Sequence, residues 1–161
     1  MALSGRTITI TVIVVAGLLV AYTVYLSVNV PGAVTTQVPS GFTVDGKTYT
    51  FTYIATTQAE RQAGLMNRKV TSTTTELFAF PSFGEWQFWM YDTNTSLDMI
   101  WVNATGALGR VVYIVTSAQP CYNSGACVVY TPTAPANYVI EAKAGFATAN
   151  GILVGTQIQF N

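Results

Sequence analysis

The chain has 161 residues, with 7 basic and 7 acidic side chains and no histidine. This length allows one ordinary domain with an appendage, and the zero net charge excludes the clustered positive charge that nucleic-acid-binding proteins present to phosphates. The lack of histidine excludes Ser-His-Asp and Cys-His catalysis, and two cysteines cannot supply the four ligands of a structural zinc site. We therefore predict no metal site, no cofactor, no nucleic-acid partner and no catalytic residue.

Residues 7–30 are the first predicted element, an uncharged and largely apolar run. As a helix they would span about 36 Å, which exceeds the ~30 Å hydrocarbon core of a bilayer. Arg6 precedes the run, so the positive-inside tendency places the amino terminus in the cytoplasm and the rest of the chain outside. The sequence thus predicts a single-pass anchor over residues 1–30 that contacts membrane lipid. The alternative is a cleaved signal peptide.

Residues 31–40 are uncharged, with Pro or Gly near both ends, and are predicted to be a linker. Residues 41–161 are predicted to be an exported β domain, because their apolar residues mostly alternate with a period of two. Asp45-Gly46 is typical of a hairpin turn. Strand-like runs cover residues 42–44, 47–53, 77–80, 86–91, 99–102, 108–116, 126–130, 138–142 and 157–160. This pattern predicts a mainly β domain, either a single sandwich or a partly closed barrel.

One short helix is predicted after the second of these runs. Thr57-Gln58-Ala59-Glu60 fits a capping box, in which the Thr57 hydroxyl accepts from the Glu60 amide and the Glu60 carboxylate accepts from the Thr57 amide. Gly64 is placed to end the helix, because glycine tolerates a positive φ. The pattern predicts a structural role for Glu60.

Several motifs resemble one family. They include Glu60-Arg61-x-x-Gly64-Leu65-Met66-x-Arg68, Phe88-Trp89-Met90, Tyr138-Val139-Ile140-Glu141 and Gly151-Ile152-x-x-Gly155, in this order. Together they make residues 42–160 similar to the domain of unknown function 192 family, also called uncharacterised protein family 0127. The resemblance implies a compact, mainly β domain with a short helix, often exported or membrane-anchored. It implies no activity and no catalytic residue.

Four residues are candidates for ligand binding: Tyr91, Asp92, Asp98 and Tyr130. Tyr91 ends a predicted strand, and Asp92 and Asp98 flank the loop that follows it, where two carboxylates could form an acid/base pair. For Asp98 the alternative is a structural role, either in an ion pair with an arginine or as an acceptor of turn amides. Trp89 is predicted to lie in the core, since aromatic residues at alternate strand positions are more often buried.

Cys121 and Cys127 flank a turn-rich segment and, on an exported domain, are predicted to form a disulfide. The alternative is two buried free thiols. Asn94-Thr95-Ser96 and Asn103-Ala104-Thr105 match the glycosylation sequon, so Asn94 and Asn103 are candidates for modification, with unmodified asparagine as the alternative.

The sequence favours a membrane-anchored, non-catalytic accessory or binding subunit at the cell surface or in a membrane complex, with other membrane or surface proteins as partners. The second hypothesis is a subunit of a pilin-like filament, which also joins an apolar helix to a Thr-rich β domain. The third is an envelope enzyme that acts on carbohydrate through Asp92, Asp98 or Glu141. With no histidine, we expect folding stability to stay nearly constant between about pH 7 and 5.

Overall fold

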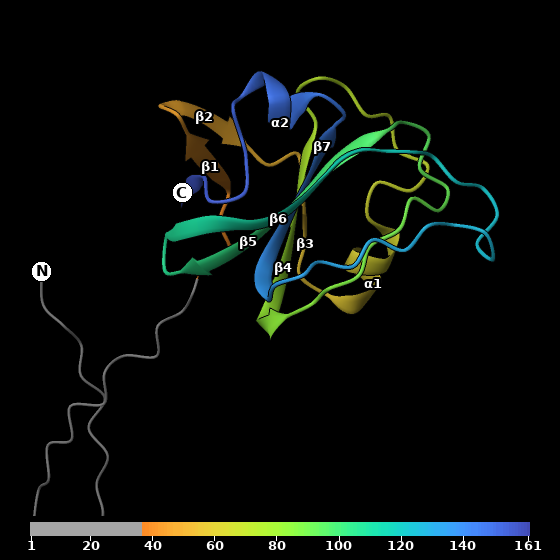
Figure 1. Ribbon diagram of the computed structural model, residues 1–161, viewed down its shortest axis with the longest axis horizontal. Helices are drawn as coiled ribbons and strands as arrows, with labels where there is room; N and C mark the ends of the chain where they lie inside the picture. The colour runs from red at the N-terminus through yellow and green to blue at the C-terminus, as the bar shows by residue number, and fades with distance from the viewer. Residues whose placement is uncertain (1–36) are drawn as a thin grey trace, which may run out of the picture. The chain divides into compact units, whose positions relative to one another are not determined.

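The computed structural model describes residues 37–161, which form one curved sheet with two short helices (Figure 1). Its elements are β1 (Gly41–Val44), β2 (Lys47–Thr50), β3 (Tyr53–Ala55), α1 (Gln58–Ala63), β4 (Thr75–Gly84), β5 (Leu97–Thr105), β6 (Leu108–Ala118), β7 (Ala136–Lys143), α2 (Phe146–Ala149) and β8 (Gln157–Phe160). The strand order is β2-β1-β8-β6-β5-β7-β4-β3. Only β3 and β4 run parallel; the other neighbours are antiparallel.

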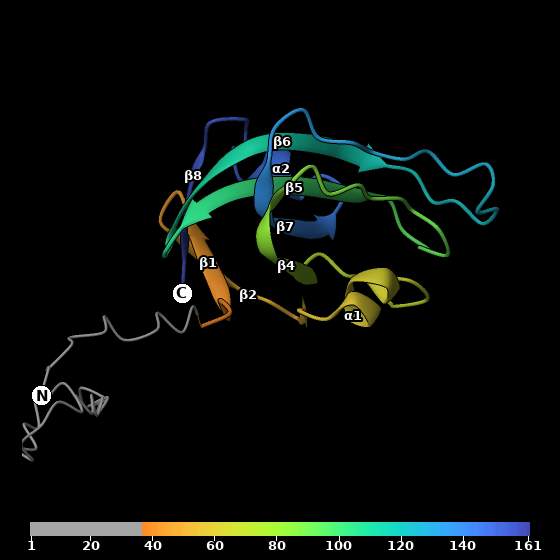
Figure 2. The same ribbon diagram turned by 90° about the horizontal axis from the view of Figure 1, so that it is seen from below.

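The prediction of a mainly β domain is confirmed, and the sheet is a half-barrel rather than a sandwich of two sheets. Figure 2 shows how strongly the long strands β5 and β6 bend. The described residues hold two short helices where the sequence predicted one, because the four-residue α2 carries no capping signal in its side chains. The predicted transmembrane segment, residues 7–30, lies outside the described residues. Among residues 37–161, no helix is long and apolar enough to cross a membrane.

The hairpin β1–β2 forms where Asp45-Gly46 predicted it. Both residues have positive φ, 48° and 72°, which a tight two-residue turn requires. Phe42 lies opposite Tyr49 in this hairpin and opposite Phe160 on the other side, because β1 also pairs with β8. The last strand therefore joins the first hairpin to β6 and the rest of the sheet.

Three predicted strands differ in the structure. Residues 47–53 are not one strand, because the chain leaves β2 at one edge of the sheet and enters β3 at the opposite edge, with Phe51 buried between them. The runs 86–91 and 126–130 form only isolated bridges. The Phe88 and Tyr130 amides bond to each other's carbonyls at 3.0 and 2.8 Å, and no ladder continues from that pair.

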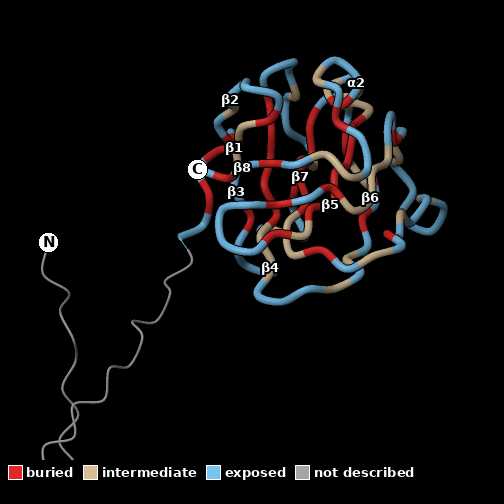
Figure 3. Tube along the Cα trace, turned by 60° about the vertical axis from the view of Figure 1, so that its left-hand side comes forward, coloured by how far each residue is buried: buried red, intermediate tan, exposed pale blue. Residues whose placement is uncertain are grey.

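The core lies on both faces of the sheet, which explains why β5 is buried along most of its length (Figure 3). Alternation sends Met99 and Trp101 to one face, together with Leu65, which follows α1. Ile100 and Val102 go to the other face, together with a residue of α2. We call these the α1 face and the α2 face.

The capping box at the start of α1 forms as predicted. The Glu60 amide donates to the Thr57 hydroxyl at 3.2 Å, and the Thr57 amide donates to Glu60 Oε2 at 2.8 Å. Further bonds from Thr56 converge on the same carboxylate oxygen. These hydrogen bonds, led by the Thr57 amide, lower the pKa of Glu60 to about 2. Glu60 is thus a structural residue that fixes how α1 leaves β3.

Candidate ligand-binding site

A pocket of about 320 Å³ lies on the α1 face, between α1 with its following turn and the segment 86–89. This volume falls within the ~300–1,000 Å³ range of small-molecule sites. The lining combines helix residues, aromatic rings and one carboxyl group: Gln58, Arg61, Gln62, Ala63, Gly64, Leu65, Met66, Phe78, Phe80, Trp86, Gln87, Phe88, Trp89, Thr93 and Glu141. The pocket is therefore apolar in its walls and polar at a few points.

A pair of buried glutamates lies beside this pocket. Glu76 of β4 and Glu141 of β7 are opposite each other in the antiparallel register, so both side chains leave the sheet on the same face. They are only 2% and 4% exposed. Glu141 lines the pocket, whereas Glu76 lies beneath Gly64, where an added Cβ would come within 3.9 Å of Glu76 Oε2. Two carboxyl groups thus lie next to each other with little exposure to water.

Burial raises the pKa of both carboxyl groups in this pair. Removal from water raises the pKa of Glu76 to about 7, with the positive charge of Arg68 acting in the opposite direction. Burial also raises the pKa of Glu141 well above its usual range, and the neighbouring Glu76 carboxylate raises it further. This shift favours the protonated form of Glu141, in which the carboxyl group can both donate and accept a hydrogen bond.

One oxygen of the pair has no partner. Glu76 Oε2 is buried and accepts no hydrogen bond within the described residues. A buried polar atom without a partner costs ~1–3 kcal/mol of folding free energy. The folded domain thus leaves a polar atom without a hydrogen-bond partner beside a pocket. The glutamate pair is therefore the strongest candidate for function among the described residues.

One wall of the pocket is a stack of three side chains. Arg61 lies over one ring, with its guanidinium carbon 5.0 Å from the Phe80 centroid, and Phe80 stacks on Trp86 at 4.2 Å. The guanidinium also donates to the carbonyls of Thr56 at 2.6 Å and Ala79 at 2.9 Å. Because these contacts hold it in place, Arg61 presents a fixed positive charge at the pocket wall.

Trp89 is not a core residue, and its predicted burial is wrong. Its side chain is 43% exposed and lines the pocket, while Phe88 and Met90 on either side are 9% and 1% exposed. Alternation in this extended segment therefore sends the two neighbours into the α1-face core and Trp89 outward. Among the aromatic side chains of the lining, the Trp89 indole is the one that counts as exposed.

Asp98 lies on the opposite face of the sheet from the pocket and is fully buried. Its two oxygens accept from the backbone amides of Ser117 and Ala147, each at 2.9 Å. This matches the structural alternative, acceptance of amides. Since the carboxylate is occupied and faces α2, it does not converge with Glu141 on one site.

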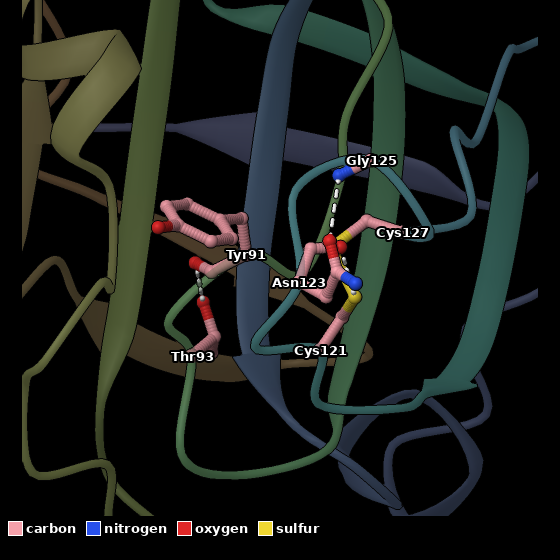
Figure 4. Close-up of a disulfide and its surroundings, with 6 residues drawn as sticks. All are labelled: Tyr91, Thr93, Cys121, Asn123, Gly125 and Cys127. Carbon is pink, nitrogen blue, oxygen red and sulfur yellow. Dashed lines mark hydrogen bonds between the residues drawn. A yellow bond between two sulfur atoms is a disulfide. The ribbon is translucent and has the colours of Figure 1, made fainter.

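The other predicted binding residues also lie outside the pocket lining. Tyr91 and Asp92 are half-buried next to the disulfide segment, and the Asp92 amide donates to the Cys121 carbonyl at 2.8 Å. Tyr91 has its ring turned away from the disulfide (Figure 4) and lies 5.5 Å from the Trp89 ring. Tyr130 is half-buried and packs against the α1-face core. The structure therefore groups Tyr91 and Asp92, and separates both from Asp98.

Sequence reasoning missed Glu76. The predicted strand begins at Leu77 and leaves Glu76 out, whereas β4 begins at Thr75 and contains it. The signal was present in the sequence, because Glu76 stands two residues before Phe78 and so shares the face of a core aromatic residue. The sequence predicts Glu141 as a candidate acid of an envelope enzyme, but it does not show that Glu76 lies opposite Glu141 in the β4–β7 pairing.

Cys121 and Cys127 form the predicted disulfide, with a Cα–Cα distance of 5.6 Å (Figure 4). The Asn123 side chain accepts from the Gly125 amide at 3.1 Å inside the closed loop. Chain-entropy arguments give ~2 kcal/mol of stabilisation for so short a loop. The bond holds together a long connection between β6 and β7 that runs past Tyr91.

The asparagines of the two sequons differ in their exposure to solvent. Asn94 is exposed in the loop before β5. Asn103 is half-buried within β5, and its side-chain amide donates to the Pro135 carbonyl at 3.2 Å. An enzyme that modifies the folded domain therefore has a free amide only at Asn94.

Comparisons with known proteins agree with this fold. The sequence profile of the DUF192 family, described as Uncharacterized ACR, COG1430, matches residues 42–160. A candidate transcription regulator from Sinorhizobium meliloti has a similar structure, with TM-score 0.63 and 24% identity over 74% of this chain and 90% of that one. A protein of unknown function from Novosphingobium aromaticivorans is also similar, with TM-score 0.60 and 28% identity over 76% and 84%. No curated protein matches the sequence.

Proposed function

We propose that this chain, which belongs to the DUF192 family, is a membrane-anchored binding protein whose exported domain takes a small ligand into the pocket beside α1. One observation carries the proposal. The Glu76–Glu141 pair is buried beside an aromatic-lined pocket and leaves Glu76 Oε2 without a partner. Such a pair costs folding free energy that apolar residues in its place would not cost, and buried groups of this kind cluster at functional sites.

Binding is favoured over catalysis because only one carboxyl group reaches the pocket. Acid/base hydrolysis of a glycosidic bond needs two carboxyl groups that flank the substrate. Glu141 lines the pocket, but Glu76 lies beneath Gly64 and Asp98 lies on the α2 face. The pocket therefore offers recognition groups without a second catalytic partner.

The location at the outer face of a membrane rests on the sequence and on the disulfide. Residues 7–30 are long and apolar enough to anchor the chain in lipid. The disulfide between Cys121 and Cys127 is typical of proteins that fold in an oxidising compartment. Both features fit a domain held outside the cytoplasm.

The binding function is tested by closing the pocket. Ala63→Phe places a ring in the lining, whereas Ala59→Phe adds the same ring at an exposed position of the same helix outside it. The full chain in detergent is screened by thermal shift against a library of neutral, acidic and basic small molecules. Ligands are expected to raise the melting temperature of the parent and of Ala59→Phe, but not of Ala63→Phe. A library without any such ligand would contradict the binding function.

The anchor is tested separately. A charged residue at the centre of a transmembrane helix costs roughly 2.5–3.5 kcal/mol on insertion scales. Gly17→Arg is therefore expected to reduce the membrane-bound fraction, with Gly17→Leu as the control that keeps it. A protease added outside intact spheroplasts should remove a tag placed after Asn161 and spare a tag placed before Met1. The opposite digestion pattern would reverse the orientation.

A further inference from the structure

The charges around the pocket restrict what it can hold. Arg61 is fixed in the wall by two backbone carbonyls and the Phe80 ring, so a cationic ligand would meet a positive charge that cannot move away. Burial and the neighbouring Glu76 carboxyl already disfavour a negative charge on Glu141, the one acidic group of the lining, so an anionic ligand beside it would be disfavoured for the same reasons. The pocket therefore selects an uncharged ligand.

The polar groups of the lining suit hydroxyl groups. An uncharged Glu141 carboxyl needs one acceptor and one donor, and a hydroxyl group supplies both. The exposed amides of Gln58 and Gln62 stand at the helix side of the pocket and have the same mixed capacity. Gln87 is partly engaged, since its amide donates to the Thr131 hydroxyl at 3.1 Å, but its carbonyl oxygen can still accept.

The aromatic surface suits a ring with apolar C–H groups. Trp89 lines the pocket with 43% of its side chain exposed, while Trp86 already stacks on Phe80. A saccharide ring has C–H groups on one side, which can cover an indole, and hydroxyl groups at its edge. An extended peptide would instead need an unpaired strand edge. The lining contains no residue of the edge strands β2 and β3.

We infer that the pocket binds an uncharged saccharide, whose ring stacks on Trp89 and whose hydroxyl groups pair with Glu141 and the glutamines of the rim. This inference deepens the proposed binding function and rests on it. Recognition needs no chemical step, because the ligand is held through stacking and hydrogen bonds alone.

The test uses the full chain in detergent at neutral pH. Titration calorimetry and tryptophan fluorescence measure binding of glucose, galactose, mannose, N-acetylglucosamine and their disaccharides. Glucuronic acid, glucosamine and a neutral tetra-alanine peptide are the comparison ligands. At least one uncharged saccharide is expected to bind saturably, and at least about tenfold more tightly than its acidic or amino counterpart.

Four variants assign the binding to the named groups. Trp89→Ala and Glu141→Leu are expected to weaken saccharide binding about tenfold or more, because one removes the stacking surface and the other leaves a ligand hydroxyl unpaired. Glu141→Gln should stay within about threefold of the parent, since an amide also donates and accepts. Phe83→Ala removes an aromatic side chain that is also exposed, at 51%, but lies outside the lining, and it should leave saccharide binding unchanged.

The outcomes separate the two proposals. Binding of an acidic, basic or peptide ligand that Ala63→Phe abolishes would overturn the saccharide inference and leave the binding function intact. Saccharide binding that is unchanged by Trp89→Ala would also overturn it. No ligand of any class sensitive to Ala63→Phe would defeat both. If Glu141→Leu fails to fold, the contrast between Trp89→Ala and Phe83→Ala decides the matter.

Discussion

Lowering the pH from about 7.5 to 5 is expected to stabilise the domain, which is the reverse of ordinary acid destabilisation. Burial raises the pKa of Glu76 from 4.5 to about 7 and raises that of Glu141 well above its usual range. A carboxyl group with a raised folded pKa stabilises the fold fully at a pH below its unfolded value. That stabilisation is lost as the pH rises through the folded value. This prediction replaces the expectation of nearly constant stability, which rested on the absence of histidine and took no account of a carboxyl group with a raised pKa.

The size of the effect follows from Glu76 alone. A shift from 4.5 to about 7 corresponds to ~3 kcal/mol when the group is fully ionised in the folded state. Between about pH 5 and 7.5, the linkage relation gives a change of ~2 kcal/mol in the free energy of unfolding. For a domain of this size, that corresponds to roughly 5–10 °C in melting temperature. Glu60 does not oppose the trend, because the stabilisation that comes with its lowered pKa is lost only as the pH falls through about 4.5 toward 2.

Thermal melts of the full chain in detergent, followed by near-ultraviolet circular dichroism at several pH values, measure this slope. Glu76→Gln/Glu141→Gln removes both titrating groups while it keeps their shape, and should flatten the curve between about pH 5 and 7.5. Glu85→Gln, at an exposed position outside the pair, is the matched control and should keep the slope. A parent melting temperature that is constant, or that falls on acidification in this range, would refute the reasoning about the buried pair.

Three further predictions concern the fold and its surface. Asp98→Ala leaves two backbone amides without their acceptor and is expected to cost about 2–5 kcal/mol in urea denaturation, whereas a loss below ~1 kcal/mol would contradict its structural role. Thr57→Ala should cost ~1 kcal/mol by loss of the helix cap, and Thr57→Ser should restore most of it; equal stability of the two variants would argue against the cap. In a host that glycosylates folded proteins, mass spectrometry of glycopeptides should find modification at Asn94 and not at Asn103, and the reverse pattern would contradict the observed access.

Local features of the fold could be predicted from the sequence because their causes are local. Asp45-Gly46 adopts the positive φ angles of its turn, and Thr57 with Glu60 forms the capping box, since each depends on residues at most three positions apart. The strands β4 to β8 are present where alternation predicted them, with ends that differ by a few residues. The disulfide also followed from a short spacing between two cysteines.

The candidate site could not be predicted in the same way, because it depends on which strands become neighbours. Glu76 and Glu141 are 65 positions apart in the chain, and only the β4–β7 pairing puts their side chains next to each other. Trp89 was misplaced because the run around it pairs at single bridges instead of joining the sheet. Asp92 and Asp98 are close in sequence, which predicts a shared site. The pleat of β5, however, sends the Asp98 carboxylate to the α2 face, away from the pocket.

The position of β8 has a consequence for how the protein matures. The hairpin β1–β2 is made first but has no partner in the sheet other than β8, which inserts between β1 and β6. The amino-terminal hairpin therefore lacks its neighbour in the sheet until the chain through Phe160 is available to pair with it. Such distant pairing slows folding. The domain therefore closes only when β8 has paired on both sides, and until then β1 and β6 each present an unpaired strand edge.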